Sequence, residues 1–492
     1  MKKIALTIIL PLLAIFLFSA FNLGEEDKTI QTGHKVRENL AVGEAEYVFR
    51  LGKVNKTRVS SLLMGFNVIY PHEKDVIWQD GKIASFLKDV NAGFIRYPGG
   101  TVCSYYHWDD LTGEGWADSW DPEKPVTPKP GSEFMDIDEY MALVKTSGAT
   151  PLVGINMSSG WRWDRQQDGL NEAVTLMKYC RDKHFNVKYW YLDNEPYQHD
   201  SNGGSKTPEE YAALINAYVP VMKAFDPDIK IVANWNAGFR NKRGEYERLL
   251  RLAGDNIDII DVHWYWSWND TSWEKWLEKT PLVQWTGFTY ESEILHFRQM
   301  VKMLGYPHIE LASFEWNTGP IRVGNSLTAP RAAFVHAEMM MQYISGGLDY
   351  AVFWPIHWPD KASRKRSFVN TATGSANPVY HIFKFMGKML DGLLVETQEI
   401  ENGNDMVSIA VLDPNEKKLR ICVINKKDKA MVTGIDMDQF PGMKLEEAQK
   451  YTVDTDGNEY SLDKTALLKS ENPDTAKFMA EGISITMLTF GI

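Results

Sequence analysis

The chain of 492 residues is 44% hydrophobic and 24% charged, the composition of an ordinary globular protein with a sizeable core, which excludes a fibrous or largely disordered chain. Its formal net charge of −12, from 53 basic and 65 acidic residues, argues against a nucleic-acid binder, because such proteins carry a basic surface. The length exceeds that of one typical domain, so we expect two domains and a leader.

Residues 1–23 have the features of a secretory signal peptide: a Lys-Lys start, an apolar core and small residues at Ser19 and Ala20. They predict a secreted or periplasmic protein with no membrane span after signal removal, since no later stretch is long and apolar enough to cross a bilayer. Phe18 interrupts the small-residue cleavage pattern, so an uncleaved N-terminal anchor is an open alternative. Residues 24–44 are polar and aperiodic and are interpreted as a linker.

The cysteines, Cys103, Cys180 and Cys422, form no cluster with the spacing of metal ligands. They allow either one disulfide with one free thiol or three buried free thiols. We therefore expect no metal site, and no motif calls for an organic cofactor. The oligomeric state is not predicted.

From about residue 60 the sequence alternates between short apolar runs and amphipathic helical segments, as in βα units around a parallel sheet. One helix has a strong start signal, because Thr207 can cap it and Pro208 occupies its first position. Eight strands are predicted, at residues 61–68, 92–100, 150–160, 187–196, 229–238, 257–266, 309–317 and 348–358. The fold class is therefore α/β, a (β/α)8 TIM barrel over residues 61–392.

After residue 393 the hydrophobic period changes from 3.6 to 2, and short strands alternate with Asn, Asp and Gly turns. Residues 393–492 therefore predict a C-terminal antiparallel β-sandwich domain. Residues 45–60 read as a further strand, and we expect it to join this sandwich rather than the barrel.

Two barrel strands end in a glutamate. The run VKYWYLDNEPYQHD (187–200) delivers Asn194 and Glu195, and the run IELASFEWN (309–317) delivers Glu315. Barrel enzymes keep their chemistry at the carboxyl ends of the strands, and the fourth and seventh strands lie on opposed sides of the barrel mouth. Two facing carboxylates indicate glycoside hydrolysis, in which one acts as acid/base and the other as nucleophile.

These residues resemble the signature of clan A glycoside hydrolases, which are retaining enzymes. Within the clan the chain most resembles glycoside hydrolase family 51, known for α-L-arabinofuranosidases, with family 39 as a neighbour. The resemblance covers the whole barrel, residues 60–392. It rests on the segments RYPGGTVCSYYHWDD, FMDIDEYMALVKTSGATPLVGINMSSG, VKYWYLDNEP, DVHWYW, FEWN and PVYHIFKFMGKMLDG.

The resemblance implies a role for each candidate residue. Glu195 would be the acid/base, Glu315 the nucleophile, and Asn194 would bind the sugar 2-hydroxyl. Arg96, at the end of the second strand, is placed to hold Glu315 ionised. The remaining substrate-binding candidates are His263 and Tyr265, which would hydrogen-bond on the nucleophile's side, and Trp354, which would form a stacking platform under the scissile sugar.

Two positions depart from the family pattern. Family 51 arabinofuranosidases carry a sugar-binding carboxylate just after the first strand, where this chain has Asn67 or Ile69 and no acid. They also carry Asn after the Gly-Gly of the second strand, where this chain has Thr101. Two contacts that select a furanose are therefore absent.

Two loops suggest a different substrate. Residues 263–276 contain five tryptophans, which predicts an extended cleft for several sugar units. The loop after the eighth strand carries Arg364 and Arg366 with two lysines, and these could contact uronates or sulfate esters, although a solvated loop explains them equally well.

The sequence thus predicts a secreted, retaining O-glycosyl hydrolase that cleaves a plant or algal polysaccharide or its oligosaccharides without a cofactor, most simply an endo-acting or cleft-binding glycanase. The alternatives are an α-L-arabinofuranosidase and, from another class, a carbohydrate-binding pseudoenzyme. The expected partner is the polysaccharide or oligosaccharide substrate, and no nucleic acid is expected.

Overall fold

The structure is a computed structural model. It describes residues 45–109, 117–123, 134–198, 205–267, 271–319, 326–358, 366–399, 405–470 and 474–491. The chain divides into two units, Met1–Leu40 and Ala41–Ile492, and every described residue belongs to the second. The expected signal peptide and the whole linker (residues 24–44) lie outside the described residues. In the described part, no helix is long and apolar enough to cross a membrane.

Eight parallel strands close into a barrel in the order β2 to β9, which confirms the predicted fold class. All neighbouring barrel strands pair in parallel, and β2 closes the ring on β9. The strands are β2 (Gly65–Asn67), β3 (Phe94–Tyr97), β4 (Thr150–Ile155), β5 (Tyr189–Leu192), β6 (Lys230–Asn234), β7 (Ile259–Trp266), β8 (Glu310–Thr318) and β9 (Tyr350–Phe353).

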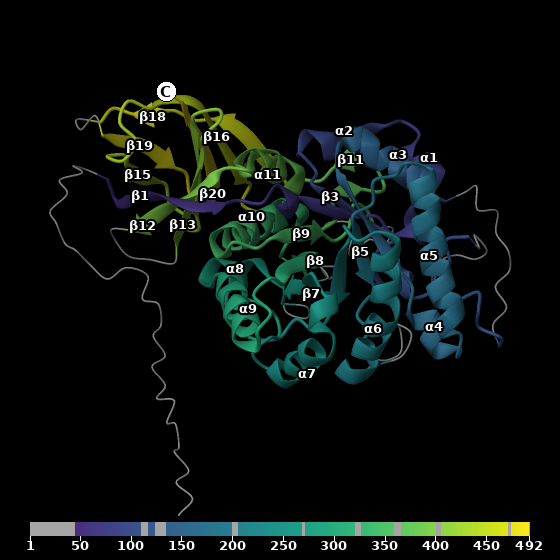
Figure 1. The fold of residues 1–492 in the computed structure, drawn as a ribbon. Helices are drawn as coiled ribbons and strands as arrows, with labels where there is room; N and C mark the ends of the chain where they lie inside the picture. Colours follow the sequence, from purple (N-terminus) through teal and green to yellow (C-terminus); the bar gives the residue numbers. More distant parts are fainter. Residues whose placement is uncertain are drawn as a thin grey trace, which may run out of the picture. The chain divides into compact units, whose positions relative to one another are not determined.

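Helices follow the strands and surround the barrel (Figure 1). The predicted start of α6 is present: the Thr207 side chain accepts a hydrogen bond from the Glu210 N–H, the Glu210 carboxylate accepts one from the Thr207 N–H, and Pro208 occupies the first helical position. The longer helices are α2 (Lys82–Asp89), α3 (Ile137–Ser147), α5 (Gln166–Asp182), α6 (Pro208–Phe225), α7 (Arg243–Ala253), α9 (Tyr290–Leu304), α10 (Ala329–Gly346) and α11 (Val379–Met386). The shorter elements are α1 (Asp75–Trp78), α4 (Ser158–Arg162), α8 (Trp273–Glu278), β10 (Val369–Asn370), β11 (Ser375–Ala376) and 3₁₀ turns at Ser61–Leu63, Tyr70–His72, Gly100–Ser104, Gly254–Asn256 and Gly387–Met389.

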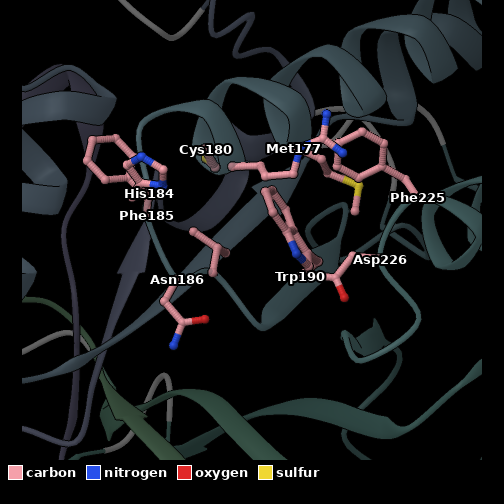
Figure 2. A pocket seen from close by; sticks show the side chains of 10 residues that line it. Met177, Cys180, His184, Phe185, Asn186, Trp190, Phe225 and Asp226 are labelled. Carbon is pink, nitrogen blue, oxygen red and sulfur yellow. The ribbon is translucent and has the colours of Figure 1, made fainter.

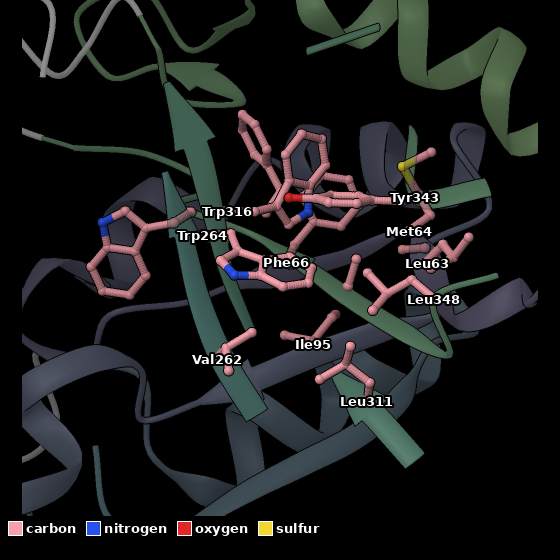
Figure 3. Close-up of a cluster of buried hydrophobic side chains, with 14 of the residues drawn as sticks. Leu63, Met64, Phe66, Ile95, Val262, Trp264, Leu311, Trp316, Tyr343 and Leu348 are labelled. Atoms are coloured by element: carbon pink, nitrogen blue, oxygen red, sulfur yellow. The ribbon is translucent and has the colours of Figure 1, made fainter. Parts of the chain in front are cut away.

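The barrel has two apolar regions, because successive strand side chains point alternately inward and outward. The interior is filled by a small cluster that includes Phe94, Tyr191 and Phe314, so the barrel is packed rather than open. The outward side chains pack under the helices. Figure 3 shows part of this layer, where Trp264 and Trp316 lie beside Tyr343, with ring centroids 6.0 and 5.3 Å from the tyrosine ring.

The C-terminal strands form one ten-stranded sheet around a core of their own. The strands are β12 (Leu393–Glu399), β13 (Met406–Asp413), β14 (Lys418–Asn425), β15 (Met431–Asp436), β16 (Lys444–Val453), β17 (Tyr460–Lys464), β18 (Leu467–Leu468), β19 (Thr475–Ala480) and β20 (Ser484–Gly491), joined by β1 (Tyr47–Arg58). The sheet differs from the expected purely antiparallel sandwich, because β1 pairs antiparallel with β12 but parallel with β15. A strand arriving from the other end of the chain is not bound to the hairpin order of its neighbours.

Helix α10 makes several of the contacts between this sheet and the barrel. Lys426 and Glu338 form an ion pair of 2.7 Å, with both side chains 1% exposed. The Tyr451 hydroxyl donates to the Pro330 carbonyl over 2.9 Å. The cysteines Cys103, Cys180 and Cys422 are all free and buried, so the second of the two thiol alternatives holds.

Candidate active site

Strand β5 ends in a segment whose backbone is held in an unusual conformation. Asp193 and Glu195 have φ angles of +60° and +44°, in the left-handed region that residues with a Cβ seldom adopt. Surrounding groups impose it: the Asp193 carboxylate accepts backbone N–H groups of Met157 and Ser158, and the Glu195 N–H donates to Asn234 Oδ1 over 2.6 Å. Strain of this kind is often retained at functional sites. The Glu195 side chain is thereby directed into the barrel mouth.

Strand β8 places Glu315 opposite. The carboxylate accepts hydrogen bonds from Arg96 Nη1 at 3.0 Å and from the Tyr265 hydroxyl at 2.8 Å. Burial and the Glu315 charge raise the pKa of Tyr265 well above its ordinary value, so the hydroxyl keeps its proton and acts as a donor. Glu315 is 6% exposed, which leaves a narrow opening toward solvent.

Arg96 ties the two strand ends together from the barrel interior. Its fully buried guanidinium donates from Nη1 to Glu315 and Asn67, and from Nη2 to Asn194 Oδ1 over 2.7 Å. The guanidinium also lies 4.4 Å from the centre of the Tyr191 ring. A planar cation with several donors is suited to this arrangement, because it fixes the directions of an amide and a carboxylate at once.

His263 lies between the two glutamates. Its Nδ1 is 2.9 Å from Glu195 Oε1 and 3.4 Å from Glu315 Oε2. The sequence placed His263 on the nucleophile's side, but its hydrogen bond is with Glu195. One oxygen of each glutamate and one nitrogen of His263 all lie within 4.8 Å of one another. The two carboxylates are therefore close across the mouth.

The pKa values of the glutamates are shifted in opposite directions. Burial raises the pKa of Glu315, against the charges of His263 and Arg96. Burial also acts to raise the pKa of Glu195, but the hydrogen bond from His263 and its charge outweigh burial and lower it. Burial would lower the pKa of His263, yet the charges of Glu315 and Asp261 raise it to about 10. While a charged His263 is bonded to Glu195, Glu195 is the more readily ionised carboxyl, the reverse of the expected order.

The same donors bear on metal binding. Three donor atoms within 4.8 Å would suffice for a metal ion by distance alone. A metal ion there would have to displace the proton of His263, whose pKa the charges of Glu315 and Asp261 raise to about 10. We assign the trio to proton chemistry and assign no cofactor to it.

Trp354 follows β9 at the same mouth and is 8% exposed. Its ring packs against Gly100, where an added Cβ would come within 2.3 Å of the ring. Gly100 also has a φ of +54°, so the second glycine of the Gly-Gly turn is needed both for its backbone and for the space that the indole fills. Trp358 lies beside it, with ring centroids 5.9 Å apart.

The basic loop after β9 is only partly described. Arg364 and the neighbouring Lys361 and Lys365 lie outside the described residues. Arg366 is 4% exposed, donates to the Thr318 carbonyl over 2.8 Å, and lies 5.9 Å from the centre of the Tyr265 ring. The structure therefore makes Arg366 a buried support of the β8 end rather than an exposed contact for an anionic sugar.

The described tryptophans of residues 263–276 do not line the predicted extended cleft. They are at most 6% exposed, and Trp273 and Trp276 stack on each other at 4.7 Å beside Phe334 of α10. Trp276 Nε1 also donates to Glu338 over 2.6 Å. These rings are packing residues of α8, and Trp268 lies outside the described residues.

The first strand explains one departure from the family pattern. Asn67 is fully buried, its amide donates to the Phe314 carbonyl over 2.8 Å, and its oxygen accepts from Arg96. Asn67 is therefore occupied within the protein. The sequence analysis missed Glu73, a buried acid beyond this strand that accepts from the Ile69 N–H and from Trp78 Nε1, so its carboxylate is also occupied.

The sequence analysis also missed Asp261, Asn234 and Tyr197. Asp261 shares the inward face of β7 with His263 and Tyr265, a spacing of two residues that could have marked it. Asn234 ends β6, and the Tyr197 hydroxyl donates to Glu195 over 3.3 Å.

A separate cavity of about 300 Å³ lies near the amino end of β5, away from both glutamates. Figure 2 shows Trp190 among the side chains that line it, together with Met177 of α5 and Asp226 beyond α6. Because barrel chemistry occurs at the carboxyl ends of strands, this cavity is not part of the candidate site.

Fold and site together resemble the clan A glycoside hydrolases. No family model matches the chain. The chain is 30% identical over 205 residues to a probable α-L-arabinofuranosidase C of Aspergillus fumigatus, covering 36% of this chain and 37% of that protein. It is 24% identical over 271 residues to intracellular exo-α-(1→5)-L-arabinofuranosidase 1 of Bacillus subtilis. This match covers 47% of this chain and 50% of that protein. The matches span half or less of these curated relatives.

Solved structures agree over more of the chain. An α-L-arabinofuranosidase of Thermotoga maritima has a TM-score of 0.69 at 19% identity, and a family 51 α-L-arabinofuranosidase of Bifidobacterium longum has 0.71 at 15%. They cover 90% and 91% of this chain and 99% of their own. A family 44 xyloglucanase of Paenibacillus polymyxa has 0.62 at 14%, covering 90% and 99%. At these identities the likeness shows the fold, and with the sequence matches it confirms the resemblance to family 51.

Proposed function

We propose that the protein is a retaining glycoside hydrolase. The observation that carries the proposal is the pair Glu195 and Glu315, which face each other at the ends of β5 and β8 with carboxylate oxygens within 4.8 Å. Retaining enzymes need closely spaced carboxylates, at about 5–5.5 Å, because one attacks the sugar directly, whereas inverting enzymes leave room for a water between them.

In this proposal Glu315 attacks the anomeric carbon while Glu195 gives a proton to the departing oxygen, so the glycosidic bond breaks as the glycosyl–Glu315 ester forms. Glu195 then takes a proton from water, which displaces Glu315 and restores both residues. The fixed charge of Arg96 and the Tyr265 hydroxyl favour ionised Glu315.

The proposed mechanism needs Glu195 protonated and Glu315 ionised, which is the reverse of their pKa shifts in the free protein, so the shifts must change when substrate binds. His263 Nδ1 is only 0.5 Å further from Glu315 than from Glu195 (3.4 less 2.9 Å). A small shift of the imidazole toward Glu315 therefore removes the interaction that lowers the pKa of Glu195 and adds one that lowers the pKa of Glu315. We infer that a sugar in the site causes this shift, leaving Glu195 protonated as the acid.

The favoured substrate is a terminal α-L-arabinofuranoside. Both curated relatives and two of the solved structures compared above are named α-L-arabinofuranosidases. The prediction of an endo-acting enzyme depended on an extended cleft lined by the tryptophans of residues 263–276. The described tryptophans of these residues are packing residues instead. A second candidate, a glycoside of another sugar, is favoured by Asn67, whose buried amide leaves no polar group there for a furanose hydroxyl.

A panel of aryl glycosides separates these candidates. Release of the aryl group from the α-L-arabinofuranoside, with proton NMR showing that the first sugar product has the substrate's anomeric configuration, would support the favoured reading. Turnover confined to pyranosides would support the second. Binding of oligosaccharides without any turnover would instead indicate a carbohydrate-binding pseudoenzyme.

The roles are tested by alanine variants. Glu315→Ala and Glu195→Ala should each lower kcat by roughly 10³-fold or more, because each removes a reacting group. Azide should restore turnover of an activated aryl glycoside in Glu195→Ala and give a glycosyl azide of retained configuration. Glu310→Ala, at the other end of β8, is the matched control and should stay near wild type. Full activity of Glu315→Ala would refute the assignment.

We further propose export through the leader at residues 1–23. Mass spectrometry of the mature N-terminus after expression with the full leader tests this. A protein that retains the leader and partitions with membranes would indicate the anchor alternative.

A further inference from the structure

The β8 strand contains a bulge just before Glu315. In its register with β7, Val262 lies opposite Ser313 but His263 lies opposite Glu315, so Phe314 is an extra residue. The pairing with β9 is interrupted over the same segment. A bulge changes the direction of the following side chain, and here that side chain is Glu315.

A bulge leaves backbone groups without partners in the strand ladder, and in a packed barrel these must be satisfied by side chains. The Phe314 N–H donates to Asp261 Oδ1 over 2.7 Å. The Phe314 carbonyl accepts from the Asn67 amide over 2.8 Å. Both side chains are fully buried, so the bulge is held from β7 on one side and from β2 on the other.

The second oxygen of Asp261 reaches the other glutamate. Asp261 Oδ2 accepts from Asn234 Nδ2 over 2.8 Å, and Asn234 Oδ1 accepts the backbone N–H of Glu195 over 2.6 Å. Oδ2 also lies 3.3 Å from Nε2 of His263, whose other nitrogen faces both glutamates. One carboxylate thus connects to the backbone next to Glu315, to the backbone of Glu195 and to the imidazole between them.

We propose that Asp261 is a positioning residue that sets the separation of Glu195 and Glu315 by holding the β8 bulge and the Asn234 and His263 side chains together. This inference rests on the proposed function only for its kinetic test. The geometry requires an acid at this position: a carboxylate accepts on both oxygens, and all three partners present N–H groups.

The test is Asp261→Asn, which has nearly the same shape. Whichever way the amide turns, its NH2 group faces a donor, either the Phe314 N–H or the Asn234 and His263 nitrogens. We expect kcat to fall roughly 10²-fold, as for an interaction of about 3 kcal/mol at 1.36 kcal/mol per tenfold, with KM within about threefold. The loss should appear in kcat because misplaced carboxylates affect the chemical step most.

Asp349→Asn is the matched control. Asp349 Oδ2 also accepts a backbone N–H of β8, that of Leu311, over 2.9 Å, but at the other end of the strand. It should lower the thermal midpoint while leaving kcat within about threefold of wild type. An Asp261→Asn enzyme with wild-type kcat, or an Asp349→Asn enzyme that loses as much kcat, would overturn the proposal.

The pH profile adds a readout that loss of stability alone does not move. The charged groups that face His263 are Glu195 just after β5, Glu315 from β8 and Asp261 from β7, and Arg96 from β3 pairs with Glu315 beside them. Removing the Asp261 charge lowers the pKa of His263, whose charge and hydrogen bond lower the pKa of Glu195, so the alkaline limb of kcat/KM should move to higher pH. An unchanged alkaline limb would count against the proposal.

A measurement without turnover separates this inference from the proposed function. Amide hydrogen exchange at Phe314 should be strongly protected in the wild type and at least about tenfold faster in Asp261→Ala, because the alanine side chain offers the Phe314 N–H no acceptor. If the wild type hydrolyses no glycoside, the proposed function fails while this exchange result still decides the role of Asp261. Equal exchange in both proteins would refute that role.

Discussion

Replacing Arg96 by lysine tests whether the fork of the guanidinium, and not only its charge, organises the site. The buried side chain donates to Glu315 at 3.0 Å and to Asn194 at 2.7 Å from different nitrogens. A lysine ammonium keeps the charge but cannot reach both acceptors in this geometry. A hydrogen bond to a charged group contributes about 1.5–3 kcal/mol and one to a neutral group about 1 kcal/mol.

A lysine that keeps only one of these two hydrogen bonds should therefore cost about 1–3 kcal/mol, which is a fall in kcat/KM of roughly 5–150-fold at 1.36 kcal/mol per tenfold. The assay is kcat/KM on the best aryl glycoside, with the thermal midpoint measured in parallel. Because lysine retains a cation beside Glu315, the acid limb of the pH profile of kcat/KM should stay close to that of the wild type. An Arg96→Lys enzyme within about fivefold of wild type would show that charge alone is sufficient.

Arg96→Met separates charge from geometry. It leaves Glu315 buried without its fixed cation, and breaking a buried pair in this way costs about 3–5 kcal/mol. Burial already raises the pKa of Glu315, and losing Arg96 raises it further. A carboxyl whose pKa is raised on folding stabilises the protein at low pH and loses that effect as the pH rises through its folded-state pKa. The destabilisation should therefore be smallest in acid, and equal destabilisation at every pH would refute this explanation.

Two further predictions concern stability. Burial would lower the pKa of His107, but its hydrogen bonds with Asp118 and Glu172 raise it from 6.5 to about 9. The protonated His107 therefore stabilises the folded protein fully below pH 6.5, and this stabilisation is lost as the pH rises through 9. The urea midpoint should fall over that range in the wild type but not in His107→Gln, and parallel curves would contradict this. Glu338→Gln leaves the buried Lys426 ammonium without its ion pair and should lower the free energy of unfolding in urea by about 3–5 kcal/mol. The double variant Lys426→Met with Glu338→Leu should recover much of that loss. Equal stability of Glu338→Gln and the wild type would contradict the prediction.

The barrel could be predicted because a parallel sheet buries both faces of its strands, and each strand then appears as a short apolar run. The ends of the strands were less predictable. The first run was expected over residues 61–68, but β2 covers only Gly65–Asn67, because Ser60 caps a 3₁₀ turn at Ser61–Leu63. Local side-chain capping of this kind competes with strand pairing and leaves the hydrophobic pattern unchanged.

The candidate site was predictable where a side chain lies at a strand end, as for Glu195 and Glu315. It was not predictable where the position depends on register. The bulge at Phe314 follows from pairing with two neighbouring strands, and no local pattern marks it. The prediction of a cleft from the tryptophans of residues 263–276 was wrong for a related reason. An aromatic run has the same sequence pattern whether it packs under α10 or faces a substrate.

Asn67 shows how substrate selection and nucleophile placement are connected in this chain. Asn67 is one of the two positions, with Ile69, at which the resembled family would carry a sugar-binding carboxylate, and its amide donates to the Phe314 carbonyl at the bulge. The Asn67 amide also donates to the Phe353 carbonyl over 3.2 Å. An acid at this position would place a carboxylate oxygen, which can only accept, against both carbonyl oxygens. Restoring the family's carboxylate by one substitution would therefore disturb the support of Glu315. A change of sugar specificity here requires a replacement for the Asn67 amide at the Phe314 carbonyl, because its other donor, Arg96 Nη1, lies 3.5 Å away.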